Sequence, residues 1–137
     1  ADNRYEASIA PRAGARIETR WRTLENIPED SRSHNRRLTA GQFPQVLEVI
    51  AVLEEVAAKH GKTLAQTAIR WVLDQEGVTA AIVGASRPEQ VDQNIGALGW
   101  RLDPADWQRL ADVSLPLSAD LGPHDTLWNW HPRVPRR

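Results

Sequence analysis

The chain has 137 residues, of which 41% are apolar, enough for one modest hydrophobic core and therefore for one domain or a piece of one. Its 17 basic and 18 acidic residues nearly cancel, which argues against a general attraction to nucleic acid or to an anionic membrane. It contains no cysteine, so disulfides, thiolate metal sites and cysteine nucleophiles are excluded, and no apolar run suits a signal peptide or a membrane span. We expect a cytoplasmic protein.

Residues 1–42 show no helical or strand period, and they mix prolines and glycines with many arginines. This composition predicts an irregular loop or insertion segment, either disordered or a functional lid. The chain opens with Ala1 and contains no methionine, so we expect a processed or truncated product.

From Phe43 onward, apolar residues recur at helical spacing and predict one buried helix face, made by Val46, Val49, Ile50, Leu53, Val56 and Ala57. Gly61 suits the left-handed position that ends such a helix. Thr63 and Gln66 form a capping-box pattern, which predicts a second helix up to Gly77. The apolar face of that helix comprises Ala65, Ala68, Ile69, Val72 and Leu73.

Residues 78–83 form a short β-branched and apolar run between two glycines. The run predicts a strand buried on both faces, as in a parallel sheet, and helix–strand–helix order indicates an α/β fold. A single buried strand would leave its backbone donors and acceptors unpaired. We therefore expect neighbouring strands that this chain does not contain.

Two further helices are predicted. Ser86, Pro88 and Glu89 give a capping box with proline in the first turn, and the helix buries Val91, Ile95 and Leu98. Asp103 and Pro104 begin the last helix, which runs through Trp107, Leu110 and Ala111 and fades near Pro116. Residues 116–137 have no period and are expected to form a tail. We assign Trp71, Trp100 and Trp107 to the core rather than to a ligand platform.

The segment from Ile82 to Gln90 is the best candidate for chemistry. A strand that runs into a glycine turn and then a helix presents backbone N–H groups and the positive end of the helix dipole to an anion. Gly84 permits close approach, Ser86 can donate to a phosphate oxygen, and Arg87 offers a planar fork suited to a dianion. Gln90 and Asn94 lie one turn apart, where they can reach a purine or ribose. The local pattern alone leaves an alternative equally open: Ser86 only caps the helix, and Arg87 is solvated.

These residues resemble a known family. Trp71-Val72-Leu73, Gly77-Val78-Thr79, Ile82 to Gln90, Asn94 and Gly96-Ala97-Leu98 are similar to the last βα unit of aldo-keto reductases, closest to the branch with the potassium-channel β subunits and related bacterial reductases. The resemblance extends over the flanking helices, from about Phe43 to Val113. It implies the C-terminal portion of a (β/α)8 TIM barrel, with the C-terminal βα units in residues 43–115.

The resemblance also implies NADP(H) as cofactor. The loop matching Gly84, Ala85, Ser86, Arg87 and Gln90 grips the adenosine 2′-phosphate end in the family, and the positions of Gln93 and Asn94 contact the adenine. Gln93 stands where the branch often has glutamate. Arg32 matches an arginine that clasps the pyrophosphate or ribose region, and Arg22, with Arg20 as a rival, matches a phosphate contact. Trp128 and Trp130 lie in the tail that can help shape the substrate pocket, unless that tail is unstructured.

No catalytic residue is assigned to this chain. The family's tyrosine, lysine, aspartate and histidine come from the N-terminal half of the barrel, and we take Tyr5, Lys59 and Lys62 as structural or solvated. No metal site is predicted, because His34, His60, His124 and His131 lack ligand spacing. Arg36 and Arg37 either extend the phosphate patch or are solvated. The expected partners are the N-terminal half of the barrel, as missing sequence or a partner chain, and a small carbonyl substrate; an oligomer is left open.

Three functional interpretations remain at this stage. The chain is the cofactor-binding part of an NADP(H)-dependent carbonyl oxidoreductase, inactive alone; or it is a non-catalytic helical interaction module; or it is an inactive remnant. The helices around Gly61 resemble a helix-turn-helix unit, which favours the second, but the balanced charge argues against DNA.

Overall fold

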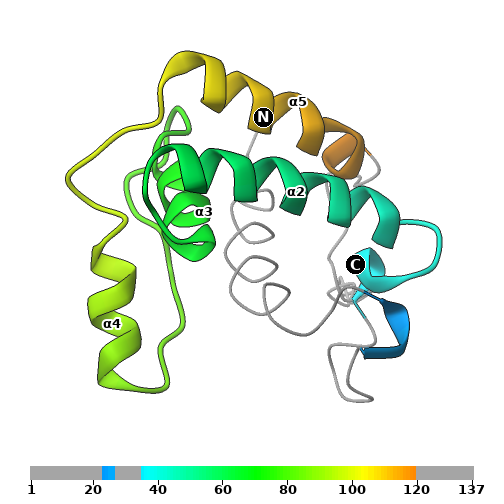
Figure 1. The fold of residues 1–137 in the computed structure, drawn as a ribbon, viewed down its shortest axis with the longest axis horizontal. Coiled ribbons are helices and arrows are strands. Elements are labelled where there is room, and N and C mark those ends of the chain that lie inside the picture. The colour runs from blue at the N-terminus through cyan, green and yellow to red at the C-terminus, as the bar shows by residue number, and fades with distance from the viewer. Residues whose placement is uncertain (1–22, 27–34, 120–137) are drawn as a thin grey trace, which may run out of the picture.

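The computed structural model describes residues 23–26 and 35–119, and within these ranges the regular structure is helical (Figure 1). Two short 3-10 turns, η1 (Leu24–Asn26) and η3 (Arg36–Leu38), precede the α-helices. The four α-helices are α2 (Phe43–Lys59), α3 (Leu64–Leu73), α4 (Pro88–Ile95) and α5 (Pro104–Ala119). Helices α2 and α5 lie side by side and run in opposite directions, and α4 stands apart from them, joined to α3 and α5 by connections without regular structure (Figure 1).

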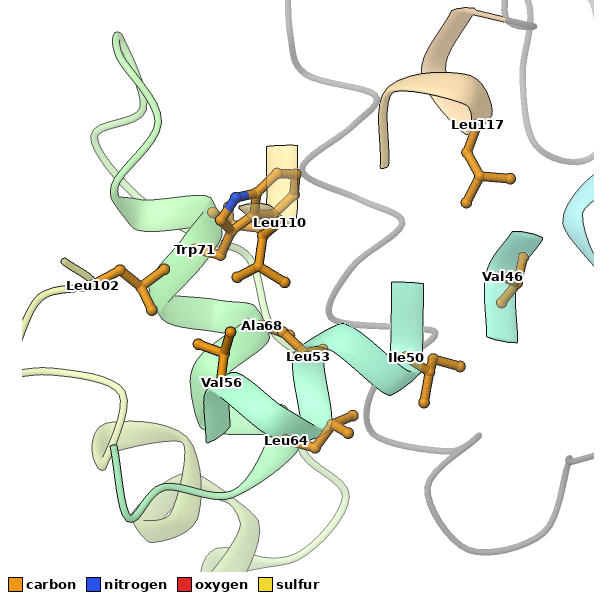
Figure 2. Packing of buried hydrophobic residues seen from close by; sticks show 11 residues of the cluster. Val46, Ile50, Leu53, Val56, Leu64, Ala68, Trp71, Leu102, Leu110 and Leu117 are labelled. Carbon is orange, nitrogen blue, oxygen red and sulfur yellow. The ribbon is translucent and has the colours of Figure 1, made fainter. Parts of the chain in front are cut away.

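The core lies where α2, α3 and α5 meet (Figure 2). The predicted faces of α2 and α3 are largely confirmed, since apolar side chains three and four residues apart fall on one side of a helix. Val49, Ala65 and Leu73 are only half-buried, and Trp71 belongs to the core as expected, with Trp100 and Trp107 packed against it. The cluster consists of Val46, Ile50, Leu53, Val56, Leu64, Ala68, Trp71, Val72, Leu102, Leu110 and Leu117.

The junction between α2 and α3 follows the sequence signals closely. Gly61 has a φ of 60°, and the amides of Gly61 and Lys62 donate to the carbonyls of Ala58 and Ala57, which is the Schellman ending of a helix. At the start of α3, Thr63 and Gln66 exchange the two hydrogen bonds of a capping box, at 3.1 and 3.2 Å. A tight turn therefore joins two helices that were both predicted.

The structure does not form the strand predicted at residues 78–83. Residues 78–85 have no regular secondary structure and no bridging partner in the described ranges, and Ile82 is 100% exposed. Val78 and Ala81 pack against the helical core, but a strand also needs backbone partners on its edges. The expected α/β architecture is thus seen here only as its helices.

Two expectations for α4 are also corrected. Val91, Ile95 and Leu98 are 49%, 55% and 56% exposed rather than buried, and α4 buries none of its residues. Its N-cap is Arg87, without a side-chain cap bond, so the Ser86–Glu89 capping box does not form. The apolar side of this helix has no protein to cover it among the described residues.

Helix α5 begins where expected, because the Asp103 carboxylate accepts a 2.8 Å hydrogen bond from the Asp106 amide. It does not fade near Pro116 but continues to Ala119 with Pro116 inside it. Leu117 is buried against the core, and that apolar contact favours the last turn despite the proline.

Candidate functional site

The turn from Gly84 to Arg87 is open to solvent at the start of α4. All four residues are exposed, Arg87 is the extended N-cap at φ −144° and ψ 147°, and Pro88 occupies the first turn. A Cβ added at Gly84 would meet no atom within 4 Å, so the surface above this glycine is free for an incoming group. Arg87 makes no side-chain hydrogen bond or ion pair with any residue in the described ranges. The turn therefore combines a helix N-terminus with an available guanidinium, the elements of an anion site.

Ser86 and Gln90 hydrogen-bond to each other across this turn. The Ser86 amide and hydroxyl donate to the same atom, Gln90 Oε1, at 2.7 and 3.1 Å. Two donors that converge on one oxygen can also bind a phosphate oxygen, with charge-assisted hydrogen bonds. In this structure the Gln90 side chain accepts both of these hydrogen bonds from Ser86.

The other predicted residues of α4 continue along the helix. Gln90 and Asn94 are half-buried and one turn apart, and Gln93 is exposed. The Gln93 carbonyl accepts a 2.9 Å hydrogen bond from Gln66 Nε2, which ties α4 to α3. The structure therefore brings together seven of the predicted cofactor residues on one turn and one short helix: Gly84, Ala85, Ser86, Arg87, Gln90, Gln93 and Asn94.

The remaining predicted site residues lie outside the described residues. These are Arg22 and Arg32 of the proposed phosphate and pyrophosphate contacts, and Trp128 and Trp130 of the proposed substrate wall. Arg37 can be placed, and it is buried rather than solvated. Its guanidinium donates to the Leu117 carbonyl at the end of α5 and, at 2.8 Å, to Gln42 Oε1. Arg37 therefore stabilises the helix end and does not extend the phosphate patch.

A cluster of charged residues that sequence spacing did not reveal joins α2 to α5. Lys59 Nζ lies 2.6 Å from Asp103 Oδ2 and 2.7 Å from Asp106 Oδ2, and His60 Nε2 lies 2.8 Å from the latter atom. Hydrogen bonding to Asp103 and then to Asp106 raises the pKa of Lys59. The hydrogen bond from Lys59 lowers the pKa of Asp103 to about 2. Lys59 is thus a structural cation, as predicted in general terms, with two specific partners.

His60, Asp103 and Asp106 place metal-capable atoms within 4.8 Å of one another. The Lys59 ammonium already bonds to both carboxylates, so it takes the place that a metal cation would need. Trp100 completes this cluster, with its ring 5.2 Å from that of His60 and 5.5 Å from Lys62 Nζ. The arrangement fastens one end of α2 to the start of α5.

Comparison with known proteins identifies the family of the chain. The chain matches the aldo/keto reductase family over residues 13–114, well over half of its length, and it belongs to that family. The match includes α2 to α4, the turn at Gly84–Arg87 and most of α5.

Individual relatives are enzymes of several organisms. The chain is 42% identical over 81 residues to L-glyceraldehyde 3-phosphate reductase of Escherichia coli O157:H7, a match that covers 55% of this chain and 23% of that protein. It is 32% identical to aldo-keto reductase YhdN of Bacillus subtilis (strain 168), covering 57% of this chain and 24% of the relative. It is 34% identical to probable aldo-keto reductase 1 of Glycine max, a match that covers 66% of this chain and 26% of that protein. The chain spans about a quarter of the length of the curated relatives it matches.

No solved structure gives a significant match to the chain. Among the helices that the structure describes, none has the length and apolar character needed to cross a bilayer.

Proposed function

We propose that this chain is the C-terminal, cofactor-binding part of an NADP(H)-dependent aldo-keto reductase and that it holds the adenosine 2′-phosphate end of the cofactor. The observation that carries the proposal is the exposed Gly84–Arg87 turn, which begins α4 inside the region that matches the family. A helix N-terminus with an unengaged arginine favours a dianion over a neutral hydroxyl. This difference distinguishes NADP(H) from NAD(H).

The described residues divide into two contact groups. Gly84, Ala85, Ser86 and Arg87 receive the phosphate, with the Ser86 donors moving from Gln90 Oε1 to a phosphate oxygen. Gln90, Gln93 and Asn94 follow on α4 and contact the purine and ribose. Arg32 and Arg22 extend the proposed site toward the pyrophosphate.

The reaction of the whole enzyme is the reduction of a small aldehyde or ketone. The bound cofactor would supply the hydride, and the residues of this chain bind and orient its distal end. Two relatives from Escherichia coli are named reductases of L-glyceraldehyde 3-phosphate, which is consistent with a small carbonyl substrate. The catalytic tyrosine, lysine, aspartate and histidine come from outside this chain, and Trp128 and Trp130 belong to the proposed substrate wall.

The partner of this chain is the N-terminal half of the barrel, either in the same polypeptide or in a second one. Segment 78–85, which has no regular secondary structure, and the exposed residues Ile82, Val91 and Ile95 support this proposal. Neighbouring strands would pair the backbone of 78–83, and further barrel elements would cover the apolar side of α4. Within the family, we propose that the chain falls in the branch with the potassium-channel β subunits and related bacterial reductases, because its motifs between Trp71 and Leu98 resemble that branch.

Fluorescence titration of the purified chain with NADP(H) and with NAD(H) tests the proposal, using the tryptophans as reporters. We expect tighter binding of NADP(H), and we expect Arg87→Ala to abolish that preference because the guanidinium contacts the 2′-phosphate. Arg101→Ala is the matched control, since Arg101 is an exposed arginine that lies outside the turn. Equal affinities for the two cofactors, or a preference unchanged in Arg87→Ala, would reject the proposal.

A further inference from the structure

Helix α4, which follows the Gly84–Arg87 turn, is held to the other described helices mainly by polar contacts. None of its residues is buried, so apolar packing contributes little to its orientation. Among the residues that the structure describes, its attachment is concentrated at its C-terminal end, where Ala97 is fully buried. There Gln66 Nε2 donates to the Gln93 carbonyl at 2.9 Å, and Trp100 Nε1 donates to the Gly96 carbonyl at 3.2 Å. The direction of α4 therefore depends on polar contacts about two turns or more from the exposed turn.

Gln66 is the residue that connects this attachment to α3. Its Oε1 accepts from the Thr63 amide at 3.1 Å, as the capping box requires, while its Nε2 reaches across to the Gln93 carbonyl. The two partners fix the amide orientation, because an N–H group must face Oε1 and a carbonyl must face Nε2. The Gln66 side chain thus helps to cap the start of α3 and also anchors the end of α4.

Gly96 supplies the space for this contact. A Cβ at Gly96 would overlap the side-chain amide of Gln66, and the Gln93 carbonyl is also close. The φ of Gly96 is −61°, which any residue adopts, so the glycine is required by contact rather than by backbone conformation. A larger residue would push the Gln66 side chain away from Gln93.

We propose that Gln66, with Gly96 as its seat, is a positioning residue for cofactor binding: it fixes α4 and thereby the Gly84–Arg87 turn. The inference rests on the proposed function of that turn. Gln66 does not touch the cofactor; it acts through the Gln93 carbonyl. Without this bond, α4 changes its direction more freely, and binding must restore the ordered arrangement.

The variant Gln66→Glu separates the two roles of this side chain. Glutamate at the third helical position keeps the acceptor for the Thr63 amide and suits the helix dipole, but a carboxylate cannot donate to the Gln93 carbonyl. We expect NADP(H) binding to the full chain to weaken by roughly three- to tenfold, the effect of one lost hydrogen bond. We also expect faster hydrogen exchange in α4 of the free protein and unchanged exchange in α2 and α5.

The matched control is Thr63→Ala, which removes the hydroxyl cap of α3 but leaves the Gln66–Gln93 bond. It should lower the stability of the chain without changing exchange in α4 or the affinity for NADP(H). Gly96→Ala should reproduce the binding and exchange effects of Gln66→Glu, because the added methyl group displaces the same amide.

The outcomes separate this inference from the proposed function. If Arg87→Ala removes the NADP(H) preference while Gln66→Glu binds and exchanges as the unmodified chain does, the positioning role is wrong and the binding turn stands. If α4 exchanges faster in Gln66→Glu but the affinity is unchanged, the link to binding is wrong. Unfolding of Gln66→Glu would contradict the claim that its capping role survives. Failure of Arg87→Ala to affect binding rejects the proposed function itself.

Discussion

Gln90 Oε1 accepts hydrogen bonds from both the backbone amide and the hydroxyl of Ser86, at 2.7 and 3.1 Å. These are the two donors that we assign to a phosphate oxygen. In the free protein the glutamine carbonyl satisfies them, so they do not remain without an acceptor before the cofactor binds. On the proposed function, cofactor binding would exchange this neutral acceptor for a charged one, and both hydrogen bonds would become stronger.

This relationship predicts that Gln90→Glu binds NADP(H) at least about tenfold more weakly, because a carboxylate at this position repels the phosphate over a short distance. The loss should diminish at high salt, which screens the repulsion. Titration at two ionic strengths measures both effects. Gln93→Glu is the control, since it adds the same charge one turn further along α4. Equal losses in the two variants would contradict the assignment of the Ser86 donors.

The left-handed backbone of Gly61 predicts that a side chain at this position lowers the stability of the chain. Its φ of 60° is unfavourable for a residue with a Cβ, and no atom lies within 4 Å of the position that a Cβ would take. Gly61→Ala should therefore destabilise the chain by about 1 kcal/mol through backbone strain alone. Urea unfolding measures the change. Gly41→Ala, at a turn glycine without a positive φ or close neighbours, should cost much less. Similar shifts in both variants would show that the left-handed position of Gly61 is not the cause.

The pair of Lys59 and Asp103 predicts a dependence of stability on acidity. Because the folded-state pKa of Asp103 is lowered from 3.8 to about 2, its carboxylate stabilises the fold above pH 3.8, and this contribution is lost as the pH falls toward 2. Asp103→Asn keeps an acceptor for the Asp106 amide and removes the charge. Circular dichroism between pH 5 and pH 2 should show a smaller loss of stability in this variant than in the unmodified chain. Asp112→Asn, on the exposed side of α5, should leave the acid-induced loss unchanged. An unaltered profile in Asp103→Asn would contradict the role of the pair.

The purified chain should not oxidise NADPH in the presence of small aldehydes or ketones, because it lacks the catalytic groups that we place in the other half of the barrel. Absorbance of NADPH at a saturating aldehyde concentration measures this. A complete aldo-keto reductase serves as the positive control. Reductase activity that stays with the chain through two further chromatographic steps would show that the catalytic residues are misassigned.

The parts of the fold that could be predicted from the sequence are those set by local chemistry. The buried faces of α2 and α3, the ending at Gly61 and the Thr63–Gln66 box depend on residues within one or two helical turns, and the structure confirms them. The predicted burial of segment 78–83 and of the apolar side of α4 was wrong. Their apolar pattern predicts burial, but the described residues supply no neighbouring strand and no apolar surface to bury them. A strand and an apolar helix face need such partners.

The candidate site shows the same division. The exposed turn at Gly84–Arg87 was predicted from a glycine followed by a helix start, whereas the Ser86–Gln90 bond requires the conformation of a long side chain. His60 and Asp106 are separated by 46 residues, so no local spacing indicates that they meet. The Gln66–Gln93 bond was hidden for the same reason, although the capping box did identify Gln66 as a residue with a defined side-chain orientation.

The central claim is that the Gly84–Arg87 turn receives the 2′-phosphate of the cofactor. Amide NMR shifts of the chain, followed during titration with 2′-AMP and separately with adenosine, test it most directly. We predict that 2′-AMP shifts the amides of Ser86, Arg87 and Gln90 and that adenosine, which lacks the phosphate, leaves Ser86 and Arg87 nearly unchanged. Shifts from 2′-AMP that avoid this turn, or identical shifts from both compounds, would contradict the account.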